Sequence, residues 1–463
     1  QPPRARHVVG VRHHGFHLRV RALQFGEELG VHGRGEAQEG SAVAGREIGN
    51  GFGDTDLRAR YFGRVPTDEL VHCLLGRELT DRRQDAKCVT GQEHDVLRMP
   101  TDTGDLGVVD ERGLATFRDV GCLVMKTEAN DHMANYIAHC DALGIPYEDW
   151  APAKIVGRLP IYDMQAYYPA KRRDDPGFAE PTGDAIAGGV FFPTAGYVTD
   201  PALASHNLQR AAEAHGARFR FNAPIVEILR RDGRAAGVKL ADGEELLAPV
   251  VINVGGPASS QINEMAGVTG DMTMTTRALK QEVVHVPSPT AFDFEQNGIV
   301  VSDSDISCYC RPEHGNHILV GSEDPPCDDH AWVDDDMDYD RNFTDQWNVQ
   351  AMRYAQRVPS LGIPNQASGV VDCYDVTEDW IPIYDKSELP GFYMACGTSG
   401  NQFKNAPIAG KMMAALVDYC EAGNDHDTAP LSFHLPYIGR DTDVGFYSRK
   451  RAINPDSSFS VLG

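Results

Sequence analysis

One segment near the carboxyl end constrains the fold more than any other, because its pattern predicts a strand, a glycine loop and a helix in direct succession. Its sequence is GFYMACGTSGNQFKNAPIAGKMMAALVDY (residues 391–419). Gly397 and Gly400 permit a tight turn between strand and helix. We expect free N–H groups at residues 405–408, at the positive end of the helix dipole, with the charge of Lys404 beside them. Such a loop suits an electron-rich ring carbonyl or a carboxylate.

A second segment, PVVINVGGP (residues 249–257), predicts a strand buried on both faces that ends in two glycines. Gly255 and Gly256 would let a phosphate or another backbone approach closely. The residues before it predict a β-meander with Asp-Gly turns, with strands at 219–221, 224–230, 236–240 and 245–253. On its own, a strand ending in Gly-Gly is common. Together with the carboxyl-terminal loop, it indicates a sheet that holds a dinucleotide.

The remaining pattern adds a second sheet within residues 277–325 and four helices. We expect the helices at 129–143, 201–215, 343–358 and 408–422. Strands and helices interleave along the chain, so the predicted fold class is mixed α/β (α+β). The acidic run at 327–343 predicts a solvated loop, since its spacing lacks the glycine and the final Glu of a calcium-binding hand.

Residues 1–116 differ in composition from the rest. They contain 15 Arg but one Lys, one Tyr and no Trp, and they carry 16 Lys and Arg against 18 Asp and Glu. No apolar strand pattern occurs there before about Val108. Two interpretations stay open. The region is an Arg/Gly/His-rich amino terminus with weak secondary-structure signals, or it is not the sequence that naturally precedes the rest of the chain, for example because of a reading-frame error.

Charge and cysteine usage exclude several function classes. The net charge is −24, which argues against binding nucleic acid. No apolar run approaches the ~18 residues that a membrane span needs, and the first residues lack the zones of a signal peptide. The ten cysteines lack the regular spacing of a disulfide framework, which indicates reduced thiols and a cytoplasmic setting. The single C-x-C pair formed by Cys308 and Cys310 is weak evidence for a metal site, and we expect no bound metal.

Four separated motifs, in order, resemble the family of FAD-dependent amine and amino-acid oxidoreductases that includes D-amino-acid oxidase, glycine oxidase, sarcosine oxidase and dimethylglycine dehydrogenase. They are VGCLVM (120–125), GGVFFPTAGYVTDPALASHNLQRAAEAHGA (188–217), PIVEILRRDGRAAGVKLADGEELLAPVVINVGGP (224–257) and VVDCYDVTEDWIPIYDKSELPGFYMACGTSGNQFKNAPIAG (370–410). The resemblance covers about residues 117–463. It implies FAD as cofactor, an FAD-binding Rossmann-like domain with a β-meander, and a substrate domain on a mixed or antiparallel sheet.

The resemblance also implies domain boundaries and site residues. Residues 1–116 form an atypical amino-terminal region, 117–183 with 268–368 the substrate domain, and 184–267 with 369–463 the FAD domain. The implied cofactor contacts are Val226 at the adenine, Gly255 and Gly256 along the nucleotide, and Gly397, Ser399, Gly400, Asn401, Gln402, Phe403 and Lys404 at the flavin. In sarcosine-oxidase-like members, the lysine at the Lys404 position also binds the substrate carboxylate.

Three departures from the family matter. The family opens with a strand running into G-x-G-x-x-G, which cradles the FAD diphosphate. Residues 49–56 (GNGFGDTD) have glycines but no leading strand, and their spacing is chance; as written, the chain is expected to bind FAD poorly. Sarcosine oxidases place a lysine over the flavin where this chain has Leu319, which favours a dehydrogenase over an oxidase. Cys373 lies one place from the cysteine that some relatives link to the flavin, and we expect a buried thiol.

These features predict transfer of a hydride from the carbon beside an amine to flavin N5, giving an imine that water hydrolyses. The substrate would be a small amine or amino acid such as sarcosine, dimethylglycine or a D-amino acid, and the electron acceptor is open between oxygen and a protein partner. We expect Lys404, Tyr309 and Arg311 to act on the substrate; further pocket candidates are His285, Tyr374 and Trp380. Two alternatives remain: a non-catalytic or FAD-deficient member, and a 2-hydroxy-acid dehydrogenase on the same fold.

Overall fold

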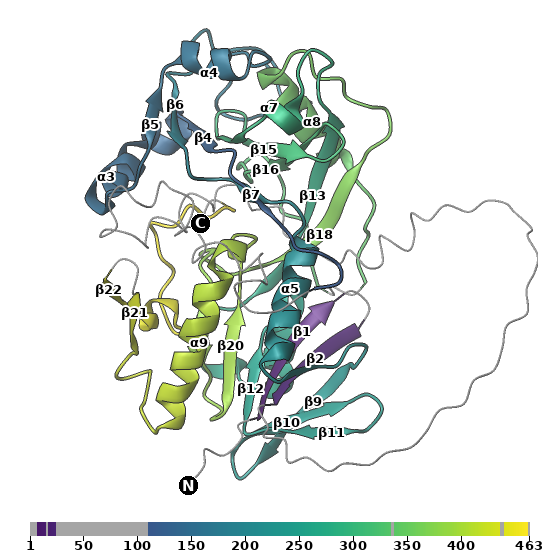
Figure 1. The fold of residues 1–463 in the computed structure, drawn as a ribbon, viewed down its shortest axis with the longest axis vertical. Helices are drawn as coiled ribbons and strands as arrows, with labels where there is room; N and C mark the ends of the chain where they lie inside the picture. Colours follow the sequence, from purple (N-terminus) through teal and green to yellow (C-terminus); the bar gives the residue numbers. More distant parts are fainter. Residues whose placement is uncertain (1–6, 15–16, 25–109, 335–337, 436–438, 462–463) are drawn as a thin grey trace, which may run out of the picture.

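The computed structural model describes residues 7–14, 17–24, 110–334, 338–435 and 439–461. Two large sheets organise these residues (Figure 1). One lies in the lower part of that view with a β-meander at its base, and the other lies in the upper part beside α7 and α8. The predicted mixed α/β class is confirmed. The glycine spacing at 49–56 lies outside the described residues.

In the described part of the chain, the lower sheet has six strands in the order β19–β20–β12–β1–β2–β8. β12 pairs in parallel with both β1 and β20, while β1–β2, β2–β8 and β19–β20 are antiparallel. This parallel centre is the Rossmann-like part of the sheet. The strand bounds are His7–His14 (β1), His17–Gln24 (β2), Ala217–Phe219 (β8), Val250–Asn253 (β12), Ile383–Lys386 (β19) and Phe392–Cys396 (β20).

The β-meander follows helix α5 and leads into the six-stranded sheet. Its strands are β9 (Ile225–Arg231), β10 (Arg234–Leu240) and β11 (Glu245–Leu247). The turn between β9 and β10 has positive φ at both Asp232 (51°) and Gly233 (78°), as a type I′ hairpin requires. The single strand expected at 245–253 is instead two, β11 and β12. Pro249, which has no N–H to donate, lies between them, where the chain passes from the meander to the six-stranded sheet.

The upper sheet runs β17–β13–β16–β15–β14–β4–β6–β5, with β18 also paired to β13. Most neighbours are antiparallel, and β4–β14 is parallel. β6 and β18 belong to this sheet, so it crosses the expected boundaries at residues 183/184 and 368/369. The bounds are Cys122–Met125 (β4), Glu148–Trp150 (β5), Gly189–Phe192 (β6), Arg277–Pro287 (β13), Val300–Asp303 (β14), Cys308–Glu313 (β15), His317–Ser322 (β16), Trp332–Val333 (β17) and Gly369–Val376 (β18).

Helices cover the sheets. Trp347 and Tyr354 of α8 pack into the largest apolar cluster on one face of the upper sheet, and Met412 and Leu416 of α9 pack on the six-stranded sheet. The α-helices are α3 (Ala134–Leu143), α4 (Pro152–Arg158), α5 (Pro201–Ala214), α6 (Ser259–Ala266), α7 (Phe294–Asn297), α8 (Asp345–Arg357) and α9 (Ala406–Glu421). Across the described ranges, no helix is both long enough and apolar enough to cross a bilayer.

Short elements complete the fold. Two strand pairs stand apart from the large sheets, β3 (Phe117–Arg118) with β7 (Tyr197–Val198) and β21 (Ser432–Leu435) with β22 (Arg440–Asp443). The 3-10 helices are η2 (Glu128–Met133), η3 (Gly256–Ala258), η4 (Thr269–Asp271), η5 (Phe403–Asn405) and η6 (Val444–Tyr447). The helix expected at 129–143 is therefore η2 followed by α3, and it ends at Gly144 with φ 69°.

Candidate functional site

The carboxyl-terminal glycine loop joins β20 to α9 and has an unusual backbone. Gly397 (φ 70°), Ser399 (49°) and Gly400 (76°) all lie in the left-handed region. A Cβ on Gly397 would lie 2.3 Å from Thr377 Cγ2, so a larger residue fits neither the backbone nor the space. Ser399 adopts this conformation without being glycine, which costs energy unless neighbours hold it in place.

The neighbour that holds the loop is Asp375 on β18, a residue that the sequence did not single out. Its Oδ2 accepts the Gly397 N–H at 2.8 Å, and its Oδ1 accepts the Thr398 hydroxyl. The Ser399 N–H donates to the Asp375 main-chain oxygen at 2.9 Å. Burial raises the pKa of Asp375, and these hydrogen bonds act in the opposite direction. The loop is thus bound to the upper sheet at three points.

The helix start differs from the expectation of free N–H groups at 405–408. The Asn405 N–H donates to the Gln402 oxygen at 3.0 Å, and the Ala406 N–H donates to the Phe403 oxygen. Pro407 has no N–H. The 3-10 turn η5 therefore satisfies donors that we expected for a ligand, and the prediction was wrong at residues 405–407. Lys404, within this turn, is half-buried.

Asn401 supplies a donor of another kind. The residue is fully buried, and its Nδ2 has no hydrogen-bond partner among the described residues. Its Oδ1 accepts from Gln402, whose own Oε1 accepts the Asn405 side chain at 2.7 Å and the Tyr384 hydroxyl at 3.3 Å. Because an unsatisfied buried donor costs free energy, it marks a place where a ligand acceptor would be stabilising.

The two glycines after β12 play different parts. A Cβ on Gly255 would lie 2.4 Å from Ile262 Cδ1, so Gly255 allows close packing of α6. Gly256, with φ 59°, faces open space. The buried Asn253, also missed from sequence, fixes this turn: its Oδ1 accepts the Gly255 N–H at 3.0 Å, and its Nδ2 donates to Asn263 Oδ1 at 2.8 Å. Val226, on β9, is 51% exposed.

Tyr309 and Arg311 lie on the face of the upper sheet opposite α8, but both are engaged. The ring of Tyr309 covers Gly321, where a Cβ would lie 2.1 Å from the ring. Arg311 Nη1 pairs with Glu313 Oε2 at 2.9 Å, and its guanidinium lies 4.9 Å from the Tyr197 ring centroid. A substrate carboxylate would have to compete with Glu313 for Arg311.

Three candidates form one row across adjacent strands. His285 on β13 pairs in register with Leu319 on β16, which pairs with Arg311 on β15. Leu319 is 3% exposed and packs in an apolar cluster. Burial lowers the pKa of His285, and its Nε2 has no partner within the described segments. The row therefore holds a neutral imidazole beside an apolar side chain.

Tyr374 and Trp380 are not part of this row. They pack with Leu279 and Val461 in a separate apolar cluster, which indicates a packing role. Cys373 is a buried thiol, and Cys308 and Cys310 face the opposite side of the sheet, where they pack toward α8. No group of three or more metal-ligating side chains occurs in the ranges that the structure describes.

The glycine loop and Arg311 approach each other through β7. Phe403, next to Lys404, packs in the apolar cluster that contains Val198, while Tyr197 of the same strand lies beneath Arg311. Burial raises the pKa of Tyr197, so its hydroxyl stays protonated near neutral pH. β7 thus contributes Val198 to the cluster that Phe403 joins and Tyr197 to the contact with Arg311.

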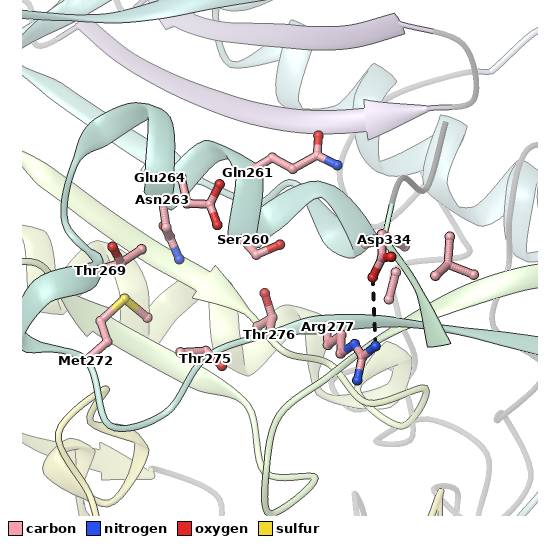
Figure 2. Close-up of a pocket in the computed structure, with 13 residues that line it drawn as sticks. Ser260, Gln261, Asn263, Glu264, Thr269, Met272, Thr275, Thr276, Arg277 and Asp334 are labelled. Carbon is pink, nitrogen blue, oxygen red and sulfur yellow. Dashed lines mark ion pairs between the residues drawn. The ribbon is translucent and has the colours of Figure 1, made fainter. Parts of the chain in front are cut away.

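A hollow of about 340 Å³, lined mostly by residues with polar side chains, lies beside this site rather than in it (Figure 2). α6 and the start of β13 form its walls. Figure 2 shows Ser260 and Thr276 across it from one another, with Arg277 and Asp334 paired at 3.8 Å at one side. None of the predicted site residues lines it. The Thr276 methyl would touch a Cβ on Gly397, at 3.3 Å, so Thr276 separates the hollow from the loop.

The two ends of the expected FAD meet different surroundings. At the flavin end, the loop held by Asp375 and the unpartnered donor of Asn401 fit a planar polar ring. At the diphosphate end, β1 is joined to β2 by two residues in an antiparallel hairpin. A parallel crossover needs a dozen residues or more. The described amino-terminal strands therefore provide no glycine turn and helix start for the diphosphate.

Comparison with known proteins agrees with the resemblance to this family. A family model described as "FAD dependent oxidoreductase" matches residues 108–416. Glycine oxidase of Geobacillus kaustophilus is 24% identical over 265 residues, 55% of this chain and 63% of that protein. Human mitochondrial sarcosine dehydrogenase is 28% identical over 225 residues, 46% of this chain and 23% of that protein. The match spans less than two thirds of each relative's length.

Among solved structures, the crystal structure of that glycine oxidase superposes with a TM-score of 0.53 at 18% identity. The superposition covers 80% of this chain and 96% of the other. At this identity the likeness establishes the fold.

Proposed function

Since the chain belongs to the family of FAD-dependent oxidoreductases, within the group of amino-acid and amine oxidases, we propose that it oxidises the C–N bond of a small amine or amino acid. The glycine loop at 397–404, inside the region that the family model matches, carries this proposal. Relatives named glycine oxidase and sarcosine dehydrogenase point to a substrate of that size with a carboxylate. The imine formed would be hydrolysed by water.

FAD, when bound, supplies the hydride acceptor. The residues of this chain orient the substrate and exclude water, which is how a protein contributes to flavin chemistry. Lys404 is a half-buried cation at the loop and attracts the substrate carboxylate. His285 is a half-buried imidazole whose pKa is lowered by desolvation, so it can accept a proton from a substrate arriving as an ammonium, since amine oxidation needs a free lone pair.

The row of His285, Leu319 and Arg311 bears on the electron acceptor. In sarcosine oxidases a lysine in this strand promotes the reaction of the reduced cofactor with oxygen, and here the position is apolar and 3% exposed. This favours a dehydrogenase, which passes electrons to a partner, over an oxidase.

An anaerobic bleaching experiment tests the proposal. The purified full chain is loaded with FAD, and sarcosine, dimethylglycine, glycine and a D-amino acid are added separately. We expect at least one to bleach the visible flavin band, with the aldehyde or keto product released. Bleaching only by glycerol phosphate or 2-hydroxyglutarate would instead identify a hydroxy-acid dehydrogenase. A protein that takes up no flavin would identify an FAD-deficient member, the alternative that the hairpin of β1 and β2 favours.

A further inference from the structure

Resting on the function proposed above, we propose that Asp375 is a positioning residue. It holds the glycine loop in its flavin-binding shape and would place a negative charge next to that loop. Asp375 lies at the end of β18 in the upper sheet, whereas the loop follows β20 of the six-stranded sheet. One carboxylate therefore fixes the flavin-side loop relative to the sheet that carries the substrate candidates.

The hydrogen bonds support the positioning role. Asp375 Oδ2 accepts the Gly397 N–H at 2.8 Å, Oδ1 accepts the Thr398 hydroxyl, and the main-chain oxygen accepts the Ser399 N–H at 2.9 Å. The Thr377 N–H also donates to the Ser399 hydroxyl at 3.3 Å. Three of the four residues 397–400 have positive φ. Such a run persists only where its surroundings determine it, and the contacts of β18 do so here.

The surroundings of Asp375 support the electrostatic role. The residue is 3% exposed. Among the described residues no cation forms an ion pair with it, and the groups that stabilise its ionised form are neutral N–H and O–H donors. When ionised, its carboxylate is therefore not paired with a cation. A negative charge beside a flavin opposes electron uptake, because charges near the ring tune its electronics. Removing this charge should raise the reduction potential.

The test measures flavin affinity and reduction potential at pH 8 in the full chain, for wild type and three variants. Asp375→Asn keeps the shape and loses the charge; we expect affinity for FAD to fall about tenfold, which corresponds to about 1.4 kcal/mol, and the potential to shift in the positive direction. Thr398→Val removes one donor and keeps the charge, so affinity should fall severalfold with the potential unchanged. Asp372→Asn, three residues earlier on β18 and outside the loop contacts, should change neither.

Several outcomes overturn the proposal. Wild-type affinity and potential in Asp375→Asn would remove Asp375 from the site. Equal shifts of the flavin reduction potential in Asp375→Asn and Thr398→Val would show that the charge of Asp375 has no effect of its own and that its role is structural only. If thermal melts show that Asp375→Asn does not fold, the test rests on Thr398→Val. Wild-type affinity for FAD in that variant would then overturn the positioning role of Asp375. A wild-type chain that binds flavin and is bleached by amines keeps the proposed function even then, whereas a wild type that binds no flavin contradicts both.

Discussion

The main-chain N–H of Gly397 donates to the carboxylate of Asp375 at 2.8 Å, although Asp375 lies on β18 of the upper sheet and Gly397 directly follows β20 of the six-stranded sheet. This bond ties the loop at 397–404 to the upper sheet. If the loop holds the flavin as proposed, the junction of the two sheets sets the position of the cofactor relative to the upper sheet.

Leu319→Lys should raise the rate at which the reduced protein reacts with oxygen. A cation in the row between His285 and Arg311 stabilises the negative charge that develops on oxygen, and we expect at least about a tenfold increase, or about 1.4 kcal/mol at the transition state. Stopped-flow reoxidation measures it. Leu319→Met, similar in volume and uncharged, serves as control and should react as wild type does. A lysine variant that folds but reoxidises at the wild-type rate would contradict the dehydrogenase assignment.

Lys404→Met should weaken binding of flavin, of the substrate carboxylate, or of both. A hydrogen bond to a charged group contributes roughly 1.5–3 kcal/mol, so we expect the Kd of FAD or the KM to rise about 10- to 100-fold. Flavin titration and steady-state kinetics separate the two effects. Lys411→Met, on an exposed position of α9, should leave both unchanged. Unaltered binding and kinetics in Lys404→Met would place this lysine outside the site.

Glu323→Gln should stabilise the fold at pH 8 and not at pH 5. Glu323 is buried, Oε1 accepts the Ser302 hydroxyl at 2.7 Å, and Oε2 has no partner within the described segments. Burial raises the pKa of Glu323 to about 7. The unfolded chain therefore binds fewer protons than the folded chain between about pH 4.5 and 7, and stability falls as pH rises through that window.

The gain in Glu323→Gln at pH 8 is expected to be on the order of a few kcal/mol. Thermal unfolding at the two pH values measures it, with Asp329→Asn, on the exposed acidic segment, as control. A Tm for Glu323→Gln that differs from wild type by the same amount at both pH values would show that Glu323 does not titrate in this range.

FAD should bind less than about tenfold more tightly than riboflavin. In a complete Rossmann-like site, the glycine turn and helix dipole stabilise the diphosphate. Here β1 pairs antiparallel with β2, the next strand described along the chain, and the sequence of residues 1–116 contains no such fingerprint. Equilibrium dialysis with both flavins measures the ratio. A ratio of a thousand or more would show that another part of the chain recognises the ADP half.

The sequence predicted the elements with local signals and missed the residues whose partners are distant. Periodicity located α5, α8 and α9 to within two residues, and Asp232-Gly233 marked the meander turn, because each signal is contained in a short window. Asp375 could not be found this way, since the N–H that it accepts lies 22 positions further along the chain. The prediction of free N–H groups at residues 405–407 was wrong because the 3-10 turn η5 precedes α9 and satisfies the donors of Asn405 and Ala406. The spacing of glycine and proline does not reveal such a turn.

The contacts of Tyr309 and Arg311 could not be predicted from the sequence either. The two residues lie two positions apart on β15 and therefore share one of its faces, and strand register decides what they meet there. Tyr309 covers Gly321 of the next strand, and Arg311 lies over Tyr197, which arrives from β7, more than a hundred residues earlier. Asn253 showed a weak signal as the polar end of a buried strand, and its bonds to the turn explain it.

A titration of flavin against two glycine variants tests the central claim, that the loop at 397–404 holds the flavin ring. In Gly397→Ala, the new Cβ would lie 2.3 Å from Thr377 Cγ2 on a backbone with φ 70°, whereas Gly410 on α9 has open space around it. Alanine at position 410 should bind flavin as wild type does and stabilise the helix by about 1 kcal/mol. We predict that the wild type and Gly410→Ala bind one flavin per chain and that Gly397→Ala, still folded by circular dichroism, loses at least tenfold in affinity. Equal flavin affinity in all three proteins would contradict the account.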